Sequence, residues 1–247
     1  MPQPPYLSVV LPIYNEQERL SGALQEVVGY LLDFPESWEI VIVDDGSRDK
    51  SGELVGQWMQ REPNIKFLRL ARNQGKGAAV KAGMLHATGR YRLFRDADSS
   101  TQMRELPAFL RLLENGAHVV IGSRRVKGAG IIRHQALLRE SLGKGFVLLC
   151  RFLLVWEVRD FTCGFKCFSA QAAQDIFSRQ TINRWAFDAE ILFLANKLGY
   201  PIAQVPVIWK DEPGSKVRVF WAVLRSLREL GQVVFNNLTG AYNIASR

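Results

Sequence analysis

Two aspartates, Asp96 and Asp98, are separated by one residue in the stretch RDADSST, directly after the apolar run from Tyr91 to Phe94. Side chains at positions i and i+2 of a strand point to the same face, so the two carboxylates repel each other unless something offsets their charge. A divalent cation with oxygen ligands does so, particularly one that is shared with a phosphate. A solvated turn rich in Asp and Ser explains the same residues without a ligand. The pair alone leaves both interpretations open.

The first half of the chain alternates between short apolar runs and helical stretches. The run at 38–45, WEIVIVDD, is continuously apolar and ends in acids, as expected of a strand buried on both faces. This alternation predicts an α/β fold of parallel βαβ units, with ligands at the carboxyl ends of the strands. The expected strands are 7–15, 38–45, 65–71, 90–96 and 118–124, and the expected helices are 16–32, 51–61, 75–87 and 103–115. The polar residues at or just past the strand ends are Asn15, Asp44, Asp45, Asp96, Asp98 and Arg124.

Charge is distributed unevenly along the 247 residues, whose formal net charge is +8. There are 14 basic and 15 acidic residues up to Ser123, but 18 basic and 9 acidic residues from Arg124 onward. The second half also holds ten of the fourteen phenylalanines, and a half that is both basic and aromatic favours an anionic partner, either a membrane or a nucleic acid. No nucleic-acid-binding motif is present. The three cysteines form no CxxC pair, which favours a reducing compartment over a zinc or disulfide framework.

Two stretches of the second half are helical and amphipathic. Residues 135–156 are very apolar but are interrupted by Arg139, Lys144 and Arg151, whereas a bilayer span needs about 20 mostly uncharged residues. An amphipathic helix in the membrane plane and a buried core helix both fit this stretch. Residues 217–238 repeat the pattern, and we expect a peripheral, membrane-facing region without a transmembrane segment. The apolar stripe expected there is formed by Phe220, Val223, Leu224, Leu227, Leu230, Val234 and Leu238.

The usual nucleotide-binding fingerprints are not in this sequence. The dinucleotide motif GxGxxG should follow the first strand, but PIYNEQERL stands there instead. Gly75-Lys76-Gly77 follows the third strand and lacks the third glycine, and nothing matches the P-loop pattern GxxxxGK[ST]. A dinucleotide-dependent enzyme and a P-loop enzyme are therefore disfavoured.

Several motifs resemble those of a known enzyme family when they are taken in order. VVLPIYNEQERL, IVIVDDGSRDKS, LARNQGKGAAVKAG, RDADSS and VIGSR resemble the family-two glycosyltransferases, which have the GT-A fold, a Rossmann-like mostly parallel sheet with helices on both faces. VRDFTCGFKCFS, RWAFDAEILFLA and VPVIWKDEPGSKV are similar to the dolichyl-phosphate β-glucosyltransferases, with the dolichyl-phosphate mannosyltransferases as the next most similar group. The resemblance covers about Leu7 to Tyr242. Eukaryotic members carry an N-terminal membrane anchor, which we do not expect in a chain that starts almost directly at its first strand.

The resemblance implies a role for the residues near the strand ends. In this family the Asp-x-Asp pair holds Mg²⁺ or Mn²⁺ against the diphosphate of a nucleotide sugar, so Asp98 is expected to ligate the metal and Asp96 to assist or to position ribose or sugar. Lys76 either approaches the phosphates or is a solvated lysine at a helix start. The nucleoside pocket is expected to be lined by Pro12, Tyr14, Glu16, Asp44 and Asp45.

The implied acceptor, a polyprenyl phosphate such as dolichyl phosphate, fits the basic half. Its second pKa is ~6, so it is already ionised at neutral pH and needs cations rather than a base. We expect Arg124, Arg139 and Lys216 to hold it. Some mannosyltransferase relatives have a serine near the position of Gly143, so we expect the contact of that serine with the acceptor to be missing here. Asp188 and Glu190 are either structural or, with a hydroxyl acceptor, a catalytic base.

The sequence thus predicts one GT-A domain over residues 1–247, in which residues 1–124 bind the nucleotide sugar and residues 125–247 bind the acceptor and the membrane. The leading hypothesis is an inverting, metal-dependent transfer of glucose from UDP-glucose to a polyprenyl phosphate at the cytoplasmic face of a membrane. GDP-mannose as donor and a lipid or saccharide hydroxyl as acceptor are the alternatives.

Overall fold

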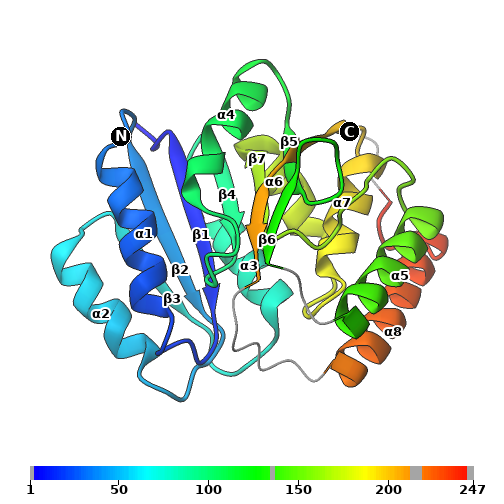
Figure 1. The fold of residues 1–247 in the computed structure, drawn as a ribbon, viewed down its shortest axis with the longest axis horizontal. Coiled ribbons are helices and arrows are strands. Elements are labelled where there is room, and N and C mark those ends of the chain that lie inside the picture. Colours follow the sequence, from blue (N-terminus) through cyan, green and yellow to red (C-terminus); the bar gives the residue numbers. More distant parts are fainter. Residues whose placement is uncertain (1–2, 134–136, 212–218, 244–247) are drawn as a thin grey trace.

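A seven-stranded mixed sheet forms the centre of the molecule (Figure 1). The computed structural model describes residues 3–133, 137–211 and 219–243. The strand order is β3-β2-β1-β4-β7-β5-β8, and every neighbouring pair is parallel except the two pairs made by β7. The strands are β1 (Leu7–Ile13), β2 (Trp38–Asp44), β3 (Ile65–Arg69), β4 (Tyr91–Arg95), β5 (Val119–Ser123), β7 (Phe165–Ser169) and β8 (Ile202–Pro206). The expected α/β architecture with a mostly parallel sheet is confirmed.

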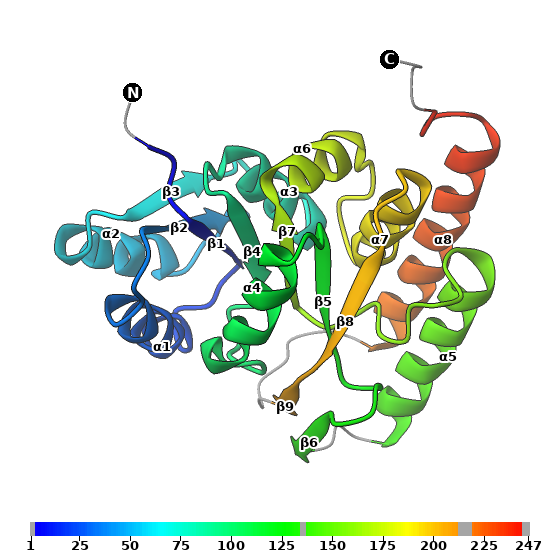
Figure 2. The same cartoon turned by 90° about the horizontal axis from the view of Figure 1, so that it is seen from above.

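Helices cover both faces of this sheet, and each face has its own apolar core (Figure 2). One core packs α1 (Leu20–Leu32), α2 (Ser51–Arg61) and α4 (Leu106–Glu114), which follows a short 3-10 turn at Met103–Glu105. The other core packs α3 (Lys76–His86), α5 (Leu137–Leu153), α6 (Ala170–Arg179), α7 (Phe187–Lys197) and α8 (Val219–Leu238). Continuous apolar strands such as Ile40 to Val43 alternate between the two cores, which is why they are apolar at every position.

The first five predicted strands and their helices all form, with ends that differ by a few residues. The largest difference is at the first helix, which begins at Leu20 instead of Glu16 because residues 14–19 form a loop. The second half adds the strands β7 and β8 to the same sheet and packs the helices α6 and α7 against it. The sequence pattern of this half did not predict these four elements. A separate two-stranded parallel pair, β6 (Gly130–Arg133) and β9 (Ile208–Lys210), lies beside the main sheet (Figure 2).

The two amphipathic stretches of the second half form α5 and α8, which pack against each other at one end of the molecule (Figure 2). The expected stripe of α8 is divided between two environments. Leu230 is buried against the core, together with Val233, which the stripe did not include. Leu224, Leu227 and Leu238 are exposed, as is Phe235. Phe220 lies outside the side chains that the structure describes.

The approach of α3 to the sheet depends on a glycine in the middle of that helix. A Cβ atom at Gly83 would lie 2.4 Å from Val10 Cγ1 of β1 and 2.8 Å from Val43 Cγ2 of β2. Both are shorter than any normal carbon contact, so a larger residue would push α3 away from the two strands. Lys76 is the first residue of this helix, so the packing at Gly83 also fixes where Lys76 lies.

We predict that Gly83→Ala lowers the free energy of unfolding by about 1–3 kcal/mol, the usual cost of overpacking a core. Gly56→Ala is the matched control, because a Cβ in this helix α2 position meets no atom within 4 Å. It should raise stability by about 0.5–1 kcal/mol, since alanine is the better helix former. Urea unfolding measures both changes, and equal stabilisation by the two substitutions would contradict the close packing of α3.

Candidate active site

The loops after β1 and β2 are tied together by side-chain to backbone hydrogen bonds. The amide of Asn15 donates to Ser47 Oγ at 2.9 Å, and the amide of Arg48 donates to Asn15 Oδ1 at 2.9 Å. Asn15 has a φ of 53°, a left-handed conformation that asparagine tolerates better than most residues. The Glu16 amide also donates to Ser51 Oγ at 2.8 Å. The segment that carries Tyr14 and Glu16 is therefore fixed relative to the end of β2.

The side chains expected to line a nucleoside pocket differ in how open they are. Tyr14 is 43% exposed, and Pro12 and Glu16 are half-buried, with the Glu16 carboxylate paired to Arg19 at 2.7 Å. Asp44 is fully buried at the end of β2. Its Oδ1 accepts a hydrogen bond from the Ser47 amide at 2.8 Å, and its Oδ2 lies 3.3 Å from Arg69 Nε. These residues lie at the carboxyl ends of the parallel strands β1 and β2.

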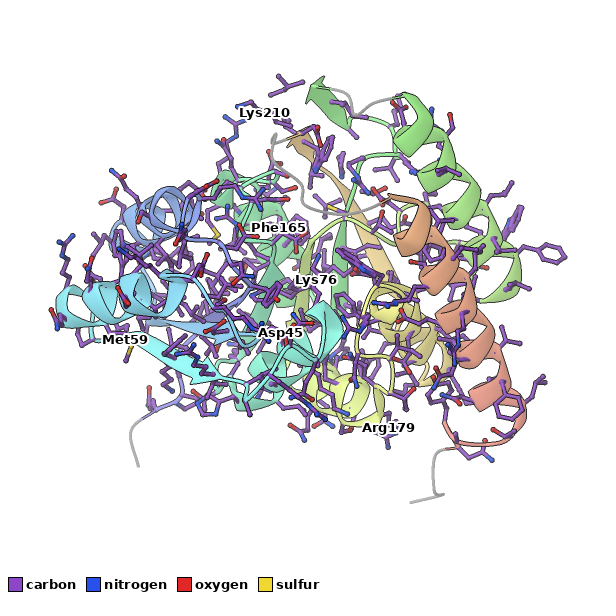
Figure 3. All side chains as sticks on the ribbon, turned by 90° about the horizontal axis from the view of Figure 1, so that it is seen from below. Asp45, Met59, Lys76, Phe165, Arg179 and Lys210 are labelled. Atoms are coloured by element: carbon purple, nitrogen blue, oxygen red, sulfur yellow. The ribbon has the colours of Figure 1, made fainter. Side chains whose placement is uncertain are left out.

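Asp45 holds the loop that leads into α3. Its carboxylate accepts hydrogen bonds from the amides of Gln74 and Gly75 at 2.7 and 2.8 Å, and from Asn73 Nδ2 at 2.8 Å. Burial raises its pKa in spite of these bonds. Gly75 has a φ of 115°, and a Cβ there would lie 2.4 Å from the Asn183 carbonyl oxygen. By holding Gly75, Asp45 also sets the position of Lys76, the residue that follows Gly75. Figure 3 shows Asp45 and Lys76 close to each other.

Lys76 points at the Asp-x-Asp segment. Its Nζ lies 2.6 Å from Asp96 Oδ1, and 5.4 Å and 5.9 Å from the ring centroids of Phe94 and Phe187. Burial lowers the pKa of Lys76, but the negative charges of Asp96 and Asp188 more than offset this and raise it above its usual value. Lys76 is therefore a charged partner of Asp96, and the interpretation of it as a solvated lysine is wrong.

Asp188 reaches the same place from the first turn of α7. It is paired with Lys166, which is fully buried in β7 and opposite Phe94 in the strand register. Lys166 Nζ also donates to the Cys163 carbonyl oxygen at 2.6 Å and lies 5.6 Å from the centroid of the Phe94 ring. Lys76 and Lys166 both lie against Phe94. We call Asp96, Asp98, Asp188, Lys76 and Lys166 the charge cluster.

The charge cluster suits a divalent cation that is shared with a substrate. It has three carboxylates and two ammonium groups, so one negative charge is left over. Asp98 is half-buried, and its Oδ1 accepts a hydrogen bond from the Ser100 amide at 3.0 Å. Among the residues that the structure describes, no three His, Cys, Asp or Glu side chains are grouped closely enough to hold a metal by themselves. One or two carboxylates suffice for Mg²⁺ when substrate phosphates complete its coordination, so the residues fit a shared metal.

Gly164 is a site residue that the sequence patterns did not single out. Its carbonyl oxygen accepts a hydrogen bond from the Asp96 amide at 2.9 Å. A Cβ at this position would lie 2.1 Å from Asp96 Oδ2, so any other residue would displace the carboxylate. The glycine of FTCGFKCFS, just before β7, therefore lets β7 pass directly beside Asp96.

Arg124, just past the end of β5, is held by an acid that the sequence analysis did not single out. Its Nε and Nη2 lie 2.7 and 2.8 Å from the two carboxylate oxygens of Asp160, and Nη2 also donates to Thr162 Oγ1 at 2.7 Å. Asp160 is fully buried; burial raises its pKa, but the Arg124 charge and hydrogen bonds outweigh this and lower the pKa to about 2. The Arg124 guanidinium lies 5.2 Å from the Trp209 ring centroid, so its orientation is fixed on two sides.

Glu190 and Asp188 lie in different surroundings although they are two residues apart. Glu190 is fully buried and accepts hydrogen bonds from the amides of Thr181 and Ile182 at 2.9 and 2.8 Å. It also accepts from the hydroxyls of Thr181 and Tyr242 at 2.6 and 2.5 Å. Glu190 therefore ties the segment before α7 to Tyr242, which follows α8. Of the two carboxylates considered as a base, Asp188 is the one in the charge cluster.

Two residues expected to hold an acceptor phosphate cannot be placed. Arg139 belongs to the first turn of α5, but its side chain lies outside the described part of the structure. Lys216 lies in the segment between β9 and α8, which is also outside the described residues.

The Asp160–Arg124 pair makes the free energy of unfolding depend on pH in the acidic range. The folded pKa of Asp160, about 2, is below the unfolded value of 3.8, so the pair stabilises the fold above about pH 4 and this contribution is lost as the pH falls toward 2. We predict that wild-type protein loses about 1 kcal/mol more of its free energy of unfolding between pH 5 and pH 3 than Asp160→Asn does. Urea unfolding at each pH tests this. Asp33→Asn, at an exposed position, is the control and should keep the wild-type dependence; the same dependence in Asp160→Asn would contradict the proposed coupling.

Comparison with known proteins identifies the family to which this chain belongs. Residues 8–177 match the family model "Glycosyl transferase family 2". A dolichyl-phosphate beta-glucosyltransferase of Dictyostelium discoideum is 38% identical, over 98% of this chain and 77% of its own length. Proteins of the same name from Homo sapiens and Saccharomyces cerevisiae are 34% and 30% identical, over 96% of this chain in each case and 78% and 76% of their own lengths.

Solved structures of other glycosyltransferases share the fold at low sequence identity. Glucosyl-3-phosphoglycerate synthase of Mycobacterium tuberculosis, in complex with UDP, superposes with a TM-score of 0.68 at 16% identity, covering 94% of this chain and 80% of the other. A mannosyltransferase of Pyrobaculum calidifontis, in complex with GDP-Man and Mn²⁺, gives a TM-score of 0.63 at 16% identity, covering 95% of this chain and 65% of the other. This chain, with its GT-A fold and its match to the family model over most of its length, belongs to glycosyl transferase family 2 and is a glycosyltransferase.

Proposed function

We propose that the enzyme transfers glucose from UDP-glucose to the phosphate of a polyprenyl phosphate such as dolichyl phosphate, with inversion at the anomeric carbon. The observation that carries this proposal is the similarity, over nearly the whole chain, to proteins named dolichyl-phosphate beta-glucosyltransferase. A phosphate oxygen of the acceptor attacks the anomeric carbon, the bond from that carbon to the diphosphate breaks, and UDP leaves.

The donor occupies the carboxyl ends of β1, β2 and β4. Asp98, with Asp96, would hold Mg²⁺ or Mn²⁺ against the donor diphosphate, which supplies Lewis-acid stabilisation of the leaving group. Lys76 pairs with Asp96 at 2.6 Å and holds that carboxylate in place. Burial raises the pKa of Asp96, and the Lys76 charge acts against this shift. Tyr14 supplies an exposed ring beside Pro12 and Glu16, and the buried carboxylates of Asp44 and Asp45 close the base of the nucleoside pocket. In this assignment residues 1–124 bind the nucleotide sugar.

The acceptor phosphate is held by cations from residues 125–247 and by Arg124 at the boundary. Asp160 and Thr162 orient the Arg124 guanidinium, and Trp209 supports its face. Arg139 and Lys216 complete the anion site in this assignment. The acceptor is largely dianionic at neutral pH because its second pKa is ~6, so the enzyme needs no general base for attack. Asp188 then acts as a positioning residue, a role supported by its pairing with the buried Lys166.

We further propose that the enzyme attaches peripherally to the cytoplasmic face of a membrane through α5 and α8. In the described part of the chain, no helix combines the length and the apolar character needed to cross a membrane. Leu148 and Phe152 of α5 and Leu224 and Leu227 of α8 are at least 40% exposed, an arrangement that suits shallow insertion of two adjacent helices. A long prenyl chain would then remain in the bilayer while its phosphate reaches Arg124.

Two alternatives keep the same fold. GDP-mannose could replace UDP-glucose as donor, since a solved structure with this fold contains GDP-Man. A lipid or saccharide hydroxyl could replace the phosphate as acceptor, and Asp188 would then have to serve as its base. The pairing of Asp188 with Lys166 opposes that role, because the buried ammonium group already engages the carboxylate that would have to accept the proton of the hydroxyl.

We predict that Asp98→Asn abolishes glycolipid formation, because the amide keeps the shape of the side chain but removes the charge that attracts the cation. Transfer is measured with UDP-glucose, a short polyprenyl phosphate and Mg²⁺, and EDTA should stop the wild-type reaction. Asp33→Asn serves as the control for the loss of one exposed carboxylate and should retain full activity. Wild-type rates in Asp98→Asn, or in the presence of EDTA, would refute the metal assignment.

A second prediction separates a phosphate acceptor from a hydroxyl acceptor. Arg139→Ala should reduce kcat/KM for the polyprenyl phosphate roughly tenfold to hundredfold, because a charge-assisted contact worth ~1.5–3 kcal/mol is lost. Donor binding should hardly change. Asp188→Asn should keep a measurable rate, whereas loss of a general base costs about 10²–10⁴-fold. An unaffected Arg139→Ala variant, beside a folded Asp188→Asn variant that binds donor but is inactive, would favour a hydroxyl acceptor.

A further inference from the structure

A basic pocket of about 400 Å³ lies on α5, on the side of the molecule that carries the proposed membrane contact. It is formed between α5, the start of the segment after β5, and the loop that leads to β7. The lining residues are Arg125, Lys144, Val147, Leu148, Arg151 and Arg159. Four of these six residues are cations, and no acidic side chain of the described residues lines the pocket, so its chemistry suits an anion.

Two acids of the described residues lie near the basic side chains of this α5 pocket. Glu140 pairs with Lys144 at 2.8 Å, and Asp160 is engaged by Arg124. Burial lowers the pKa of Arg125, and the neighbouring charge of Arg124 lowers it further against the opposing effect of Asp160 and Glu140. A partly buried cation next to another cation gains most from a bound anion, because both the desolvation and the repulsion are then offset.

Some of these groups are held in place by the fold. The Arg151 guanidinium lies 4.3 Å from the centroid of the Trp156 ring, and its Nε donates to the Trp156 carbonyl oxygen at 2.9 Å. The Arg159 amide donates to Gln204 Oε1 at 2.8 Å, which anchors the loop from which its exposed side chain extends. Lys144 and Arg151 are seven residues apart on α5, two turns along the same helix face. The cations are therefore spread over a surface wide enough for a phosphate-bearing headgroup.

Large apolar side chains stand beside the α5 pocket in solvent. Leu148 is 58% exposed, Phe152, one turn further along α5, is 79% exposed, and Trp156 is 57% exposed. Such groups are costly in water but suit the boundary between headgroups and acyl chains, where tryptophan in particular is favoured. A free phosphate ion would use the cations and leave these three side chains unexplained, whereas an amphiphile uses both.

We propose that the α5 pocket binds the phosphate-bearing headgroup of an anionic phospholipid, while Leu148, Phe152 and Trp156 enter the adjoining acyl region. This lipid is a membrane anchor and is distinct from the acceptor, whose phosphate we assign to Arg124. The inference rests on the peripheral membrane contact proposed above. It adds that attachment is selective for the headgroup and involves a defined pocket.

The first test is vesicle binding by the full chain. Lys144→Gln/Arg159→Gln removes two exposed lining cations and should weaken partition onto phosphatidylcholine vesicles containing phosphatidic acid roughly 30-fold, since each basic residue near such a surface contributes about fivefold. Arg61→Gln/Arg111→Gln removes two exposed cations from α2 and α4 and should have no effect. Unchanged melting temperatures in both variants show that the fold is intact. Equal loss in the two double variants would overturn the proposal in favour of general charge attraction.

The second test separates a pocket from a diffuse basic surface and from the acceptor site. Short-chain phosphatidic acid, kept below its micelle concentration, should bind wild type saturably with one molecule per chain and bind Lys144→Gln/Arg159→Gln at least tenfold more weakly. Inorganic phosphate should compete poorly, because it cannot use Leu148, Phe152 and Trp156. Non-saturable binding, or competition by phosphate as strong as by the lipid, would overturn the headgroup assignment.

Transferase activity in detergent, with short polyprenyl phosphate, distinguishes this inference from the proposed function. Lys144→Gln/Arg159→Gln should keep the wild-type KM for the soluble acceptor, because the α5 pocket does not hold it. A tenfold rise in that KM would show that the pocket belongs to the acceptor site, which refutes the separate lipid site but leaves the proposed function intact. Phe152→Ser should weaken vesicle binding without changing the preference for phosphatidic acid over phosphatidylcholine; loss of that preference would contradict the division of roles.

Discussion

Electrostatic balance around Phe94 is the constraint on which the rest of the site depends. Asp96, Asp98 and Asp188 would repel one another if they stood alone, and Lys76 and Lys166 lie against the Phe94 ring and pair with Asp96 and Asp188. Because Lys166 is completely buried, its charge would be very costly without Asp188. The two ammonium groups offset part of the repulsion among the three carboxylates, which lets these carboxylates stand close enough together to share a divalent cation with a substrate.

The features that could be predicted from the sequence are those that depend on neighbouring residues along the chain. Strands such as β2 are buried on both faces, so their apolar runs are continuous, and parallel connections bring Asp44 and Asp96 to the same edge of the sheet. The predicted placement of Asp44, Asp45 and Asp96 was therefore correct. The structural role of Asp45 could not be predicted, because its hydrogen-bond donors at residues 73–75 lie about thirty positions away in the sequence.

Features that depend on distant contacts had no local pattern to reveal them. β7 carries a buried lysine and a cysteine and lies between two strands that precede it in the chain, so FKCFS does not look like a central strand. Asp160 and Gly164 acquire their importance only through Arg124 and Asp96. The apolar stripe predicted for α8 was also partly wrong, because this helix has apolar residues on two sides. Leu230 and Val233 face the core, whereas Leu227 and Phe235 are exposed.

The position of β7 has a consequence for how the protein is made. Until residues 165–169 are synthesised, β4 and β5 lack the strand that pairs with both of them. Each then presents an edge of unpaired backbone N–H and C=O groups. A nascent chain that has reached only the end of β5 thus lacks the backbone pairing that completes its sheet, and Asp96 lacks its contact with Gly164. Aggregation during translation should be greatest in that interval, when about forty residues separate β5 from the strand that closes the gap.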